Sequence, residues 1–203
     1  VSAETLAKEA CKIEIEVLGY PIGKQDQYAC AYGGFNTIRF NDDETVSVKP
    51  IILKREEKEA LNKRLLLFYT GINKRSDDIL TEQRQNTKNN LETLSKMVGF
   101  CDKTEKALHN KEFAKFGNLL HEGWLHKKKL SSGITNPLLD SYYERARNAG
   151  AIGGKILGSG GGGFFLFYCE EKNQEALRKE LHELKEIPFK FEQEGSRIIY
   201  VSD

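Results

Sequence analysis

Residues 158–163 read Gly-Ser-Gly-Gly-Gly-Gly, a composition that favours contact between bare backbone and a ligand. A flexible linker would have polar flanks, whereas here Ile156-Leu157 precedes the run and Phe164–Tyr168 follows it. Glycines between two buried strands indicate a loop that must approach another group closely. Successive glycine N–H groups can form a nest that binds an anion. The predicted substrate- or phosphate-binding residues of this loop are Gly158, Ser159, Gly160, Gly161 and Gly162.

The same loop also matches the spacing Gly-x-Gly-x-x-Gly of dinucleotide-binding proteins, at Gly158, Gly160 and Gly163. That fingerprint requires a helix after the loop. Residues 164–168 are aromatic or branched apolar and predict a strand instead, so we exclude the dinucleotide interpretation. The sequence contains no Walker motif either.

Asp26 lies in a polar segment, Pro21 to Tyr28, that follows the end of a predicted helix. In phosphoryl transfer a carboxylate can orient the attacking hydroxyl group or accept its proton. An ordinary turn aspartate is the alternative, and the segment alone leaves both open. Lys24 and Gln25 are candidate substrate contacts beside it, although a solvated surface lysine explains Lys24 equally well.

Glu14 belongs to a predicted helix over residues 2–18, where it shares a stripe with Ala7, Cys11 and Leu18. A carboxylate within an apolar stripe usually needs a cation or metal as its partner. Glu14 is therefore a candidate Mg²⁺ ligand, and a carboxylate that reaches water from the edge of the stripe is the alternative. Glu16 lies on a polar, solvated face. The predicted apolar face of this helix consists of Leu6, Ala10, Ile13 and Val17.

His121 and His126 flank a Glu-Gly-Trp-Leu segment that superficially resembles a zinc motif. Zinc proteases place two histidines four residues apart on one helix face. The five-residue spacing here turns the second ring away by about 140°, so we exclude a zinc site.

The remaining chain predicts an α+β fold in which helices cover one face of an antiparallel sheet. We expect two to four helices between residues 73 and 130, broken near Gly99 and Gly117, and a further helix that opens at Asn136-Pro137. Residues 29–40 predict a turn between extended pieces, and residues 54–59 a solvated linker or short helix. The other predictions are strands at 45–53, 65–69, 151–157, 164–168, 189–191 and 198–201, and a helix at 173–185.

Composition and charge restrict the classes of protein to which this chain can belong. The formal net charge is +1, from 31 basic and 30 acidic residues mixed along the chain, which argues against nucleic-acid and membrane partners. No apolar run is long enough to span a bilayer. The four cysteines are widely spaced, which indicates buried, reduced thiols and a cytoplasmic location. The start at Val1 lacks a methionine and reads as the middle of a longer product.

These segments together resemble the GHMP kinase superfamily of small-molecule kinases. Lys155–Gly163 is similar to that family's third motif, a glycine-rich loop near the transferred phosphate, although Ala is more usual at the position of Ser159. Pro21–Asp26 is similar to the segment that carries the catalytic aspartate, which implies that role for Asp26. The family's Mg²⁺-binding glutamate falls on Glu14. ATP and Mg²⁺ are the implied cofactors, and a C-terminal domain with a ferredoxin-like sheet is the implied fold.

Finer features resemble the bacterial heptose-phosphate kinases within that superfamily, notably Gly23–Ala29, Tyr32–Asn36 and Leu120–Trp124. The implied reaction is ATP-dependent phosphorylation of the anomeric hydroxyl of D-glycero-D-manno-heptose 7-phosphate, on the route to lipopolysaccharide heptose. A GHMP kinase for fucose, galactose or a mevalonate-type alcohol is one alternative. A non-catalytic remnant that binds a sugar phosphate is another. The oligomeric state is not predicted.

The sequence departs from the family by lacking its ATP-binding motif, its N-terminal sugar-binding motif and the serine that would share the metal with Glu14. We therefore expect a fragment, with residues 1–60 as the end of an N-terminal kinase domain and residues 61–203 as the C-terminal domain. The chain alone is expected to lack kinase activity.

Overall fold

The computed structural model describes residues 1–74 and 76–200. They form two compact units. The smaller unit comprises residues 1–52 together with the chain from Lys190 onward, and the larger unit comprises residues 53–189.

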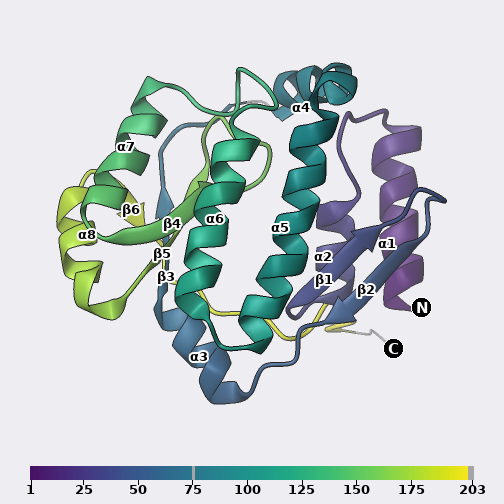
Figure 1. The fold of residues 1–203 in the computed structure, drawn as a ribbon. Coiled ribbons are helices and arrows are strands. Elements are labelled where there is room, and N and C mark those ends of the chain that lie inside the picture. The colour runs from purple at the N-terminus through teal and green to yellow at the C-terminus, as the bar shows by residue number, and fades with distance from the viewer. Residues whose placement is uncertain (75, 201–203) are drawn as a thin grey trace. The chain divides into compact units, whose positions relative to one another are not determined.

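The smaller unit consists of helices packed on a two-stranded sheet (Figure 1). Its sheet is antiparallel, with Ile38 opposite Val48. Ser2 caps the first helix by accepting a hydrogen bond from the Thr5 amide at 3.1 Å. Its elements are α1 (Ala3–Cys11), the π-helical turn η1 (Lys12–Val17), α2 (Gln25–Tyr32), β1 (Asn36–Phe40) and β2 (Val46–Pro50).

The buried face of the first helix differs from the predicted one. Ala7 and Cys11 are buried against α2, whereas Ile13 and Val17 are 54% and 69% exposed. Ala7 and Cys11 precede Lys12, so the buried face already differs within α1; from Lys12 onward the wider i→i+5 pairing of the π-helical turn also breaks the α-helical period. Ile15, and not Ile13, packs against the cluster as a result.

Helix α2 replaces the extended piece predicted for residues 29–32. The Gly33-Gly34 pair ends this helix, since Gly33 adopts a φ of 59° and its amide donates to the Ala29 carbonyl at 2.9 Å. A left-handed glycine after the last helical residue is a common helix stop. The prediction correctly located a break at the glycines but assigned the wrong structure before it.

The C-terminal segment contains no strand at 189–191 or at 198–200, contrary to prediction; Val201 lies outside the described residues. The segment joins the smaller unit through isolated contacts. The Gly34 amide donates to the Glu192 carbonyl at 3.1 Å, and the Phe35 and Phe191 rings stack with centroids 5.5 Å apart. These isolated contacts do not form the regular hydrogen-bond ladder of a sheet. The alternating apolar pattern therefore predicted strands that do not form.

The larger unit is built on a four-stranded antiparallel sheet with strand order β4-β5-β3-β6. The order of strands and helices along the chain is that of a ferredoxin-like fold, which confirms the predicted α+β class. Figure 1 shows α5 and α6 side by side, with α6 against β4. Its elements are α3 (Arg55–Lys63), β3 (Leu65–Tyr69), α4 (Ser76–Gln85), the 3-10 turn η2 (Thr87–Asn90), α5 (Leu91–His109), α6 (Phe113–Lys127), α7 (Pro137–Asn148), β4 (Ala151–Ile156), β5 (Phe164–Cys169), the 3-10 turn η3 (Glu171–Asn173), α8 (Gln174–Glu180) and β6 (Lys185–Glu186).

Aromatic side chains fill the core between helices and sheet. Trp124 of α6 and Phe165 of β5 meet edge to face, with ring centroids 6.4 Å apart, and both are fully buried. Tyr143 of α7 packs beside them against Phe167. Large buried aromatic rings dominate core energetics, so this cluster fixes how α6 and α7 lie on the sheet.

The predicted helix breaks at Gly99 and Gly117 are wrong, because both glycines lie inside helices, α5 and α6. The chain breaks instead after His109, where Lys111 adopts a φ of 61°. Gly117 serves close packing: a Cβ atom there would lie 2.7 Å from Cδ1 of Tyr168. Residues 54–59 open helix α3, so the short helix was the correct alternative.

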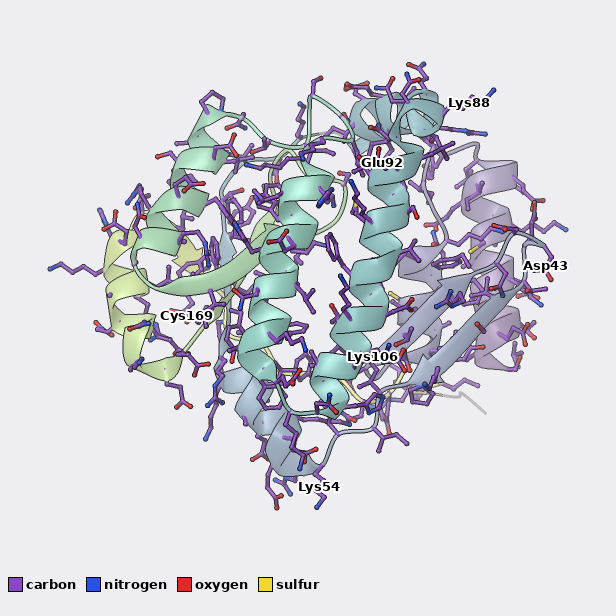
Figure 2. All side chains as sticks on the ribbon, viewed as in Figure 1. Asp43, Lys54, Lys88, Glu92, Lys106 and Cys169 are labelled. Carbon is purple, nitrogen blue, oxygen red and sulfur yellow. The ribbon has the colours of Figure 1, made fainter. Side chains whose placement is uncertain are left out.

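Two of the four cysteines contradict the expectation of buried thiols. Cys11 and Cys169 are buried, but Cys30 and Cys101 are exposed. In Figure 2 Cys169 lies in the sheet region, Lys54 at the start of α3 and Lys106 on α5. Burial raises the pKa of the Cys169 thiol to about 11. Among the helices that the structure describes, none has the length and apolarity to cross a membrane.

Two glycines of α6 provide a matched test of its packing. We expect Gly117→Ala to lower the free energy of unfolding by about 1–3 kcal/mol, because the added methyl group overpacks the helix against Tyr168. Gly123→Ala should raise it by up to about 1 kcal/mol, because the site is open and alanine favours helix. Urea unfolding followed by circular dichroism measures both. Equal effects of the two substitutions would contradict the close packing at Gly117.

Candidate functional site

Asp26 occupies the first turn of α2, directly after the helix begins at Gln25. Its side chain is exposed and makes no hydrogen bond or ion pair with any described residue. A carboxylate is favoured at a helix N-terminus by the helix dipole. Lys24 is half-buried, and its Nζ lies 3.8 Å from the Glu44 carboxylate, while Gln25 is exposed. Asp26 is therefore held on a rigid element with its oxygens open to solvent.

Glu14 lies in the π-helical turn between α1 and α2 in the sequence. It is half-buried, whereas Glu16 is exposed, as the stripe pattern predicts. The Gln27 side chain donates a hydrogen bond from Nε2 to Oε2 of Glu14. Gln27 is only 9% exposed, and its other amide atom, Oε1, is buried without a hydrogen-bond partner. Gln27 was not among the predicted site residues, because no helix was predicted for the polar segment Pro21–Tyr28 and nothing there indicated a buried side chain.

A magnesium ion bound to the Glu14 carboxylate would need its other ligands from water and substrate phosphates. The described residues contain no group of three or more histidine, cysteine, aspartate or glutamate side chains placed to hold a metal. Mg²⁺ is typically held by one or two carboxylates, with water and substrate phosphates as the other ligands. The Glu14 carboxylate, which Gln27 holds in place, is an oxygen group that suits such a hard cation.

The glycine loop joins β4 to β5 and packs against neighbouring backbone. A Cβ atom at Gly160 would lie 2.8 Å from the Ile134 carbonyl oxygen, and one at Gly162 would lie 2.3 Å from that of Ile72. Both glycines also have positive φ, 109° and 158°. Only glycine fits here, which confirms the close approach of backbone that the sequence predicts, although the contacts shown are with protein.

Two amides of the loop already have partners within the larger unit. The Gly161 amide donates to the Ile134 carbonyl at 2.7 Å, and the Gly163 amide to that of Ile72 at 2.8 Å. The Lys127 ammonium group of α6 donates to the Gly158 carbonyl. Any nest for an anion would therefore use the remaining amides of the loop. Those without a hydrogen bond to a described residue are Gly158, Ser159, Gly160 and Gly162.

Glu82 of α4 fixes the segment on which the glycine loop rests. Its carboxylate accepts hydrogen bonds from the Ser131 hydroxyl at 2.7 Å and from the Ser132 amide at 3.0 Å. These bonds, that of the Ser132 amide foremost, lower the pKa of Glu82. Ile134 of the same segment accepts the Gly161 amide, so Glu82 supports the loop indirectly. No periodicity marks Glu82 in the sequence.

The segment 131–136 joins the end of α6 to the start of α7. Asn136 caps α7, accepting from the Leu139 amide at 3.0 Å. The histidines of α6 have structural surroundings: His121 Nδ1 lies 2.7 Å from the Tyr143 hydroxyl, and the His126 ring packs against Phe100. Burial lowers the pKa of His121.

The predicted site residues thus fall into two groups. Lys24, Gln25, Asp26 and Glu14 belong to the smaller unit, whereas residues 158–162 belong to the larger one. Glu14 and α2 are linked directly through Gln27. The structure carries no ligand, so the roles assigned to these residues remain predictions.

Comparison with known proteins identifies relatives along nearly the whole chain. Residues 104–186 match the family described as GHMP kinases C terminal. The chain is 33% identical over 196 residues to D-glycero-alpha-D-manno-heptose 7-phosphate kinase of Campylobacter jejuni, covering 94% of this chain and 57% of that protein. Its fold matches a crystal structure of a D-glycero-D-manno-heptose 1-phosphate kinase from Bacteroides thetaiotaomicron with a TM-score of 0.73 and 28% identity, covering 98% of this chain and 57% of that one.

A putative sugar kinase from Campylobacter jejuni is similar at a TM-score of 0.70 and 30% identity, covering 96% of this chain and 56% of that one. The chain therefore spans little more than half the length of each of these relatives.

The Glu82 contact predicts a pH-dependent step at Ser132. Because the folded pKa of Glu82 is lowered, its ionised form stabilises the fold at neutral pH, and this contribution is lost as the pH falls through that folded pKa. In NMR titration, the Ser132 amide resonance should move with a midpoint below that of an unstructured glutamate. Glu82→Gln should abolish the step, and Glu92→Gln, on α5, should leave it in place. A step that survives Glu82→Gln would show that another group causes it.

Proposed function

We propose that this chain, which belongs to the GHMP kinase family, is part of an ATP-dependent kinase that phosphorylates the anomeric hydroxyl of D-glycero-D-manno-heptose 7-phosphate. The observation that carries the proposal is the 33% identity to a heptose 7-phosphate kinase over 94% of the chain, which extends through both units. The product would be the 1,7-bisphosphate, a precursor of lipopolysaccharide heptose. We assign the activity to the cytoplasm, where ATP and the sugar phosphate would be available as partners.

The proposed division of the chain follows the family. Residues 1–60 form the end of an N-terminal kinase domain, and residues 61–203 form the C-terminal domain. The part of a full kinase that encloses the ATP phosphates would then lie outside this chain. The match of the chain to 57% of a full-length relative is in keeping with this division.

Asp26 is the proposed catalytic residue. Its exposed carboxylate, on the first turn of α2, would orient the acceptor hydroxyl and accept its proton as the oxygen bonds to the γ-phosphorus of ATP and the bond to the leaving ADP breaks. Lys24 and Gln25 lie beside it on the same helix start, where they could contact the substrate. Because phosphoryl transfer needs little covalent chemistry from the protein, such positioning accounts for most of the catalysis.

Glu14 is the proposed magnesium ligand, and the glycine loop is the proposed phosphate contact. Mg²⁺ would neutralise the β- and γ-phosphates of ATP when bound. Glu14 supplies a carboxylate that Gln27 already orients. The unpaired amides of Gly158, Ser159, Gly160 and Gly162 would supply hydrogen-bond donors for a phosphate or sugar oxygen.

The acceptor is the least constrained part of the proposal. The two heptose kinases in the comparison carry names that differ in the position of the substrate phosphate, 7 in one and 1 in the other. Both names describe a heptose phosphate. The names therefore support a phosphorylated heptose as the acceptor class, and of the two positions only a 7-phosphate leaves the anomeric hydroxyl free to be phosphorylated.

A panel of acceptors tests the substrate. The gene product that contains this chain should phosphorylate heptose 7-phosphate with a kcat/KM well above that for heptose, heptose 1-phosphate, fucose or galactose. Coupled measurement of ADP release gives these values. Preference for fucose or galactose would replace the heptose assignment within the same family. If no acceptor in the panel gave ADP, the result would support a non-catalytic role.

Substitution of Asp26 tests the mechanism. In the same gene product, Asp26→Asn should lower kcat by about 10²- to 10⁴-fold, the usual contribution of a proton acceptor. ATP affinity, measured by calorimetry, should persist. Asp42→Asn, an exposed position after strand β1, is the matched control and should leave kcat unchanged. Full activity of Asp26→Asn would remove Asp26 from the mechanism.

A further inference from the structure

We infer that Gln27 is a positioning residue, which holds the Glu14 carboxylate in the orientation needed to bind the divalent metal. The inference rests on the proposed function, because it gives Gln27 a role only if Glu14 binds a metal. Gln27 would act through Glu14 and would not touch the substrate itself.

The hydrogen bonding of Gln27 is difficult to explain by stability alone. Its Nε2 donates to Glu14, but its Oε1 is buried and has no partner. A buried acceptor without a partner costs free energy of desolvation. An apolar side chain of the same length would fill this space without that cost and would lose only the hydrogen bond to Glu14. Violations of this kind concentrate at functional sites.

A second buried glutamine shows what a purely structural role looks like in this chain. Gln174 is also 9% exposed, but its Nε2 donates to the Lys63 carbonyl at 2.6 Å and to the Cys169 carbonyl at 3.1 Å. Neither of its amide atoms is orphaned. It therefore ties the start of α8 to the sheet region. Gln27 instead uses its donor on a carboxylate and leaves its acceptor unused.

The backbone around Glu14 is also unusual. Glu14 lies in a π-helical turn, where the Leu18 amide donates to the Ile13 carbonyl at 2.9 Å. Single π-helical turns are rare and occur often at functional sites. The turn ends the α-helical period and leaves Glu14 beside α2, where Gln27 reaches it. Backbone and side chain thus both fix one carboxylate.

The orienting role belongs to Nε2 of Gln27, because this is the amide atom that donates to the Glu14 carboxylate. A hydrogen bond to one carboxylate oxygen restricts how the side chain can turn and leaves the other oxygen available to a metal. Residues that orient a metal-ligating side chain typically contribute about 10- to 100-fold to metal affinity.

Metal binding by the gene product that contains this chain tests the inference. Mn²⁺ serves as the probe, and its dissociation constant is measured by electron paramagnetic resonance in the presence of a non-hydrolysable ATP analogue. Gln27→Met, which keeps the side-chain length but removes the amide, should weaken Mn²⁺ binding about 10- to 100-fold. The KM for the sugar acceptor should change little, and the thermal midpoint should stay constant or rise because an unpaired acceptor is removed.

Two further variants separate this role from a structural one. Gln174→Met should lower the thermal midpoint and leave Mn²⁺ affinity unchanged. Glu14→Ala should weaken Mn²⁺ binding by itself, and adding Gln27→Met to it should cause no further loss, because Gln27 acts only through Glu14.

Unchanged Mn²⁺ affinity in a folded Gln27→Met protein would overturn the inference while the kinase proposal stands. Additive losses in the double variant would also overturn it, since Gln27 would then act independently of Glu14. Failure of the unsubstituted protein to bind Mn²⁺ with the nucleotide, or to transfer phosphate, would overturn the proposed function and the inference with it.

Discussion

Helix α6 can lie on strand β4 only because Gly117 and Gly153 let the two backbones approach. A Cβ atom at Gly153 would lie 1.9 Å from the Gly117 carbonyl oxygen. This approach brings Trp124 into the core beside Phe165, and the aromatic cluster then holds β4 and β5 together. Since those two strands carry the ends of the glycine loop, the placement of the loop depends on the same contact.

The smaller unit combines a small apolar cluster with one hydrogen-bonded pair of polar side chains. Ala7, Cys11, Tyr28 and Ala31 form that cluster, and the Glu14–Gln27 pair belongs to the same two helical segments. An all-apolar arrangement would be more stable, because it would leave no amide oxygen unpaired. The retained amide is therefore easier to explain by a ligand than by folding, which is why the metal proposal and the Gln27 inference reinforce each other.

The candidate chemistry is divided between side chains and backbone. Carboxylates of the smaller unit are suited to orient a hydroxyl group and a metal, whereas the larger unit offers main-chain amides from a loop that Glu82 and Lys127 support. Electrostatic stabilisation by such fixed groups costs little reorganisation during a reaction. The chain covers 57% of a full-length relative, so this division describes only part of the proposed kinase.

The sequence by itself determined the strands at 65–69, 151–156 and 164–168, the cap at Asn136 and the unusual glycine loop, because apolar runs and caps act locally. It also marked Glu14 and Asp26 as candidate residues, partly through family resemblance. Only the tertiary structure decided that Gly117 lies inside a helix, that residues 25–32 form α2, and that residues 189–191 form no strand. The hydrogen bonds that Gln27 and Glu82 make could not be predicted from the sequence either. Each of these depends on a partner distant in the chain, and packing against such a partner overrides local preference.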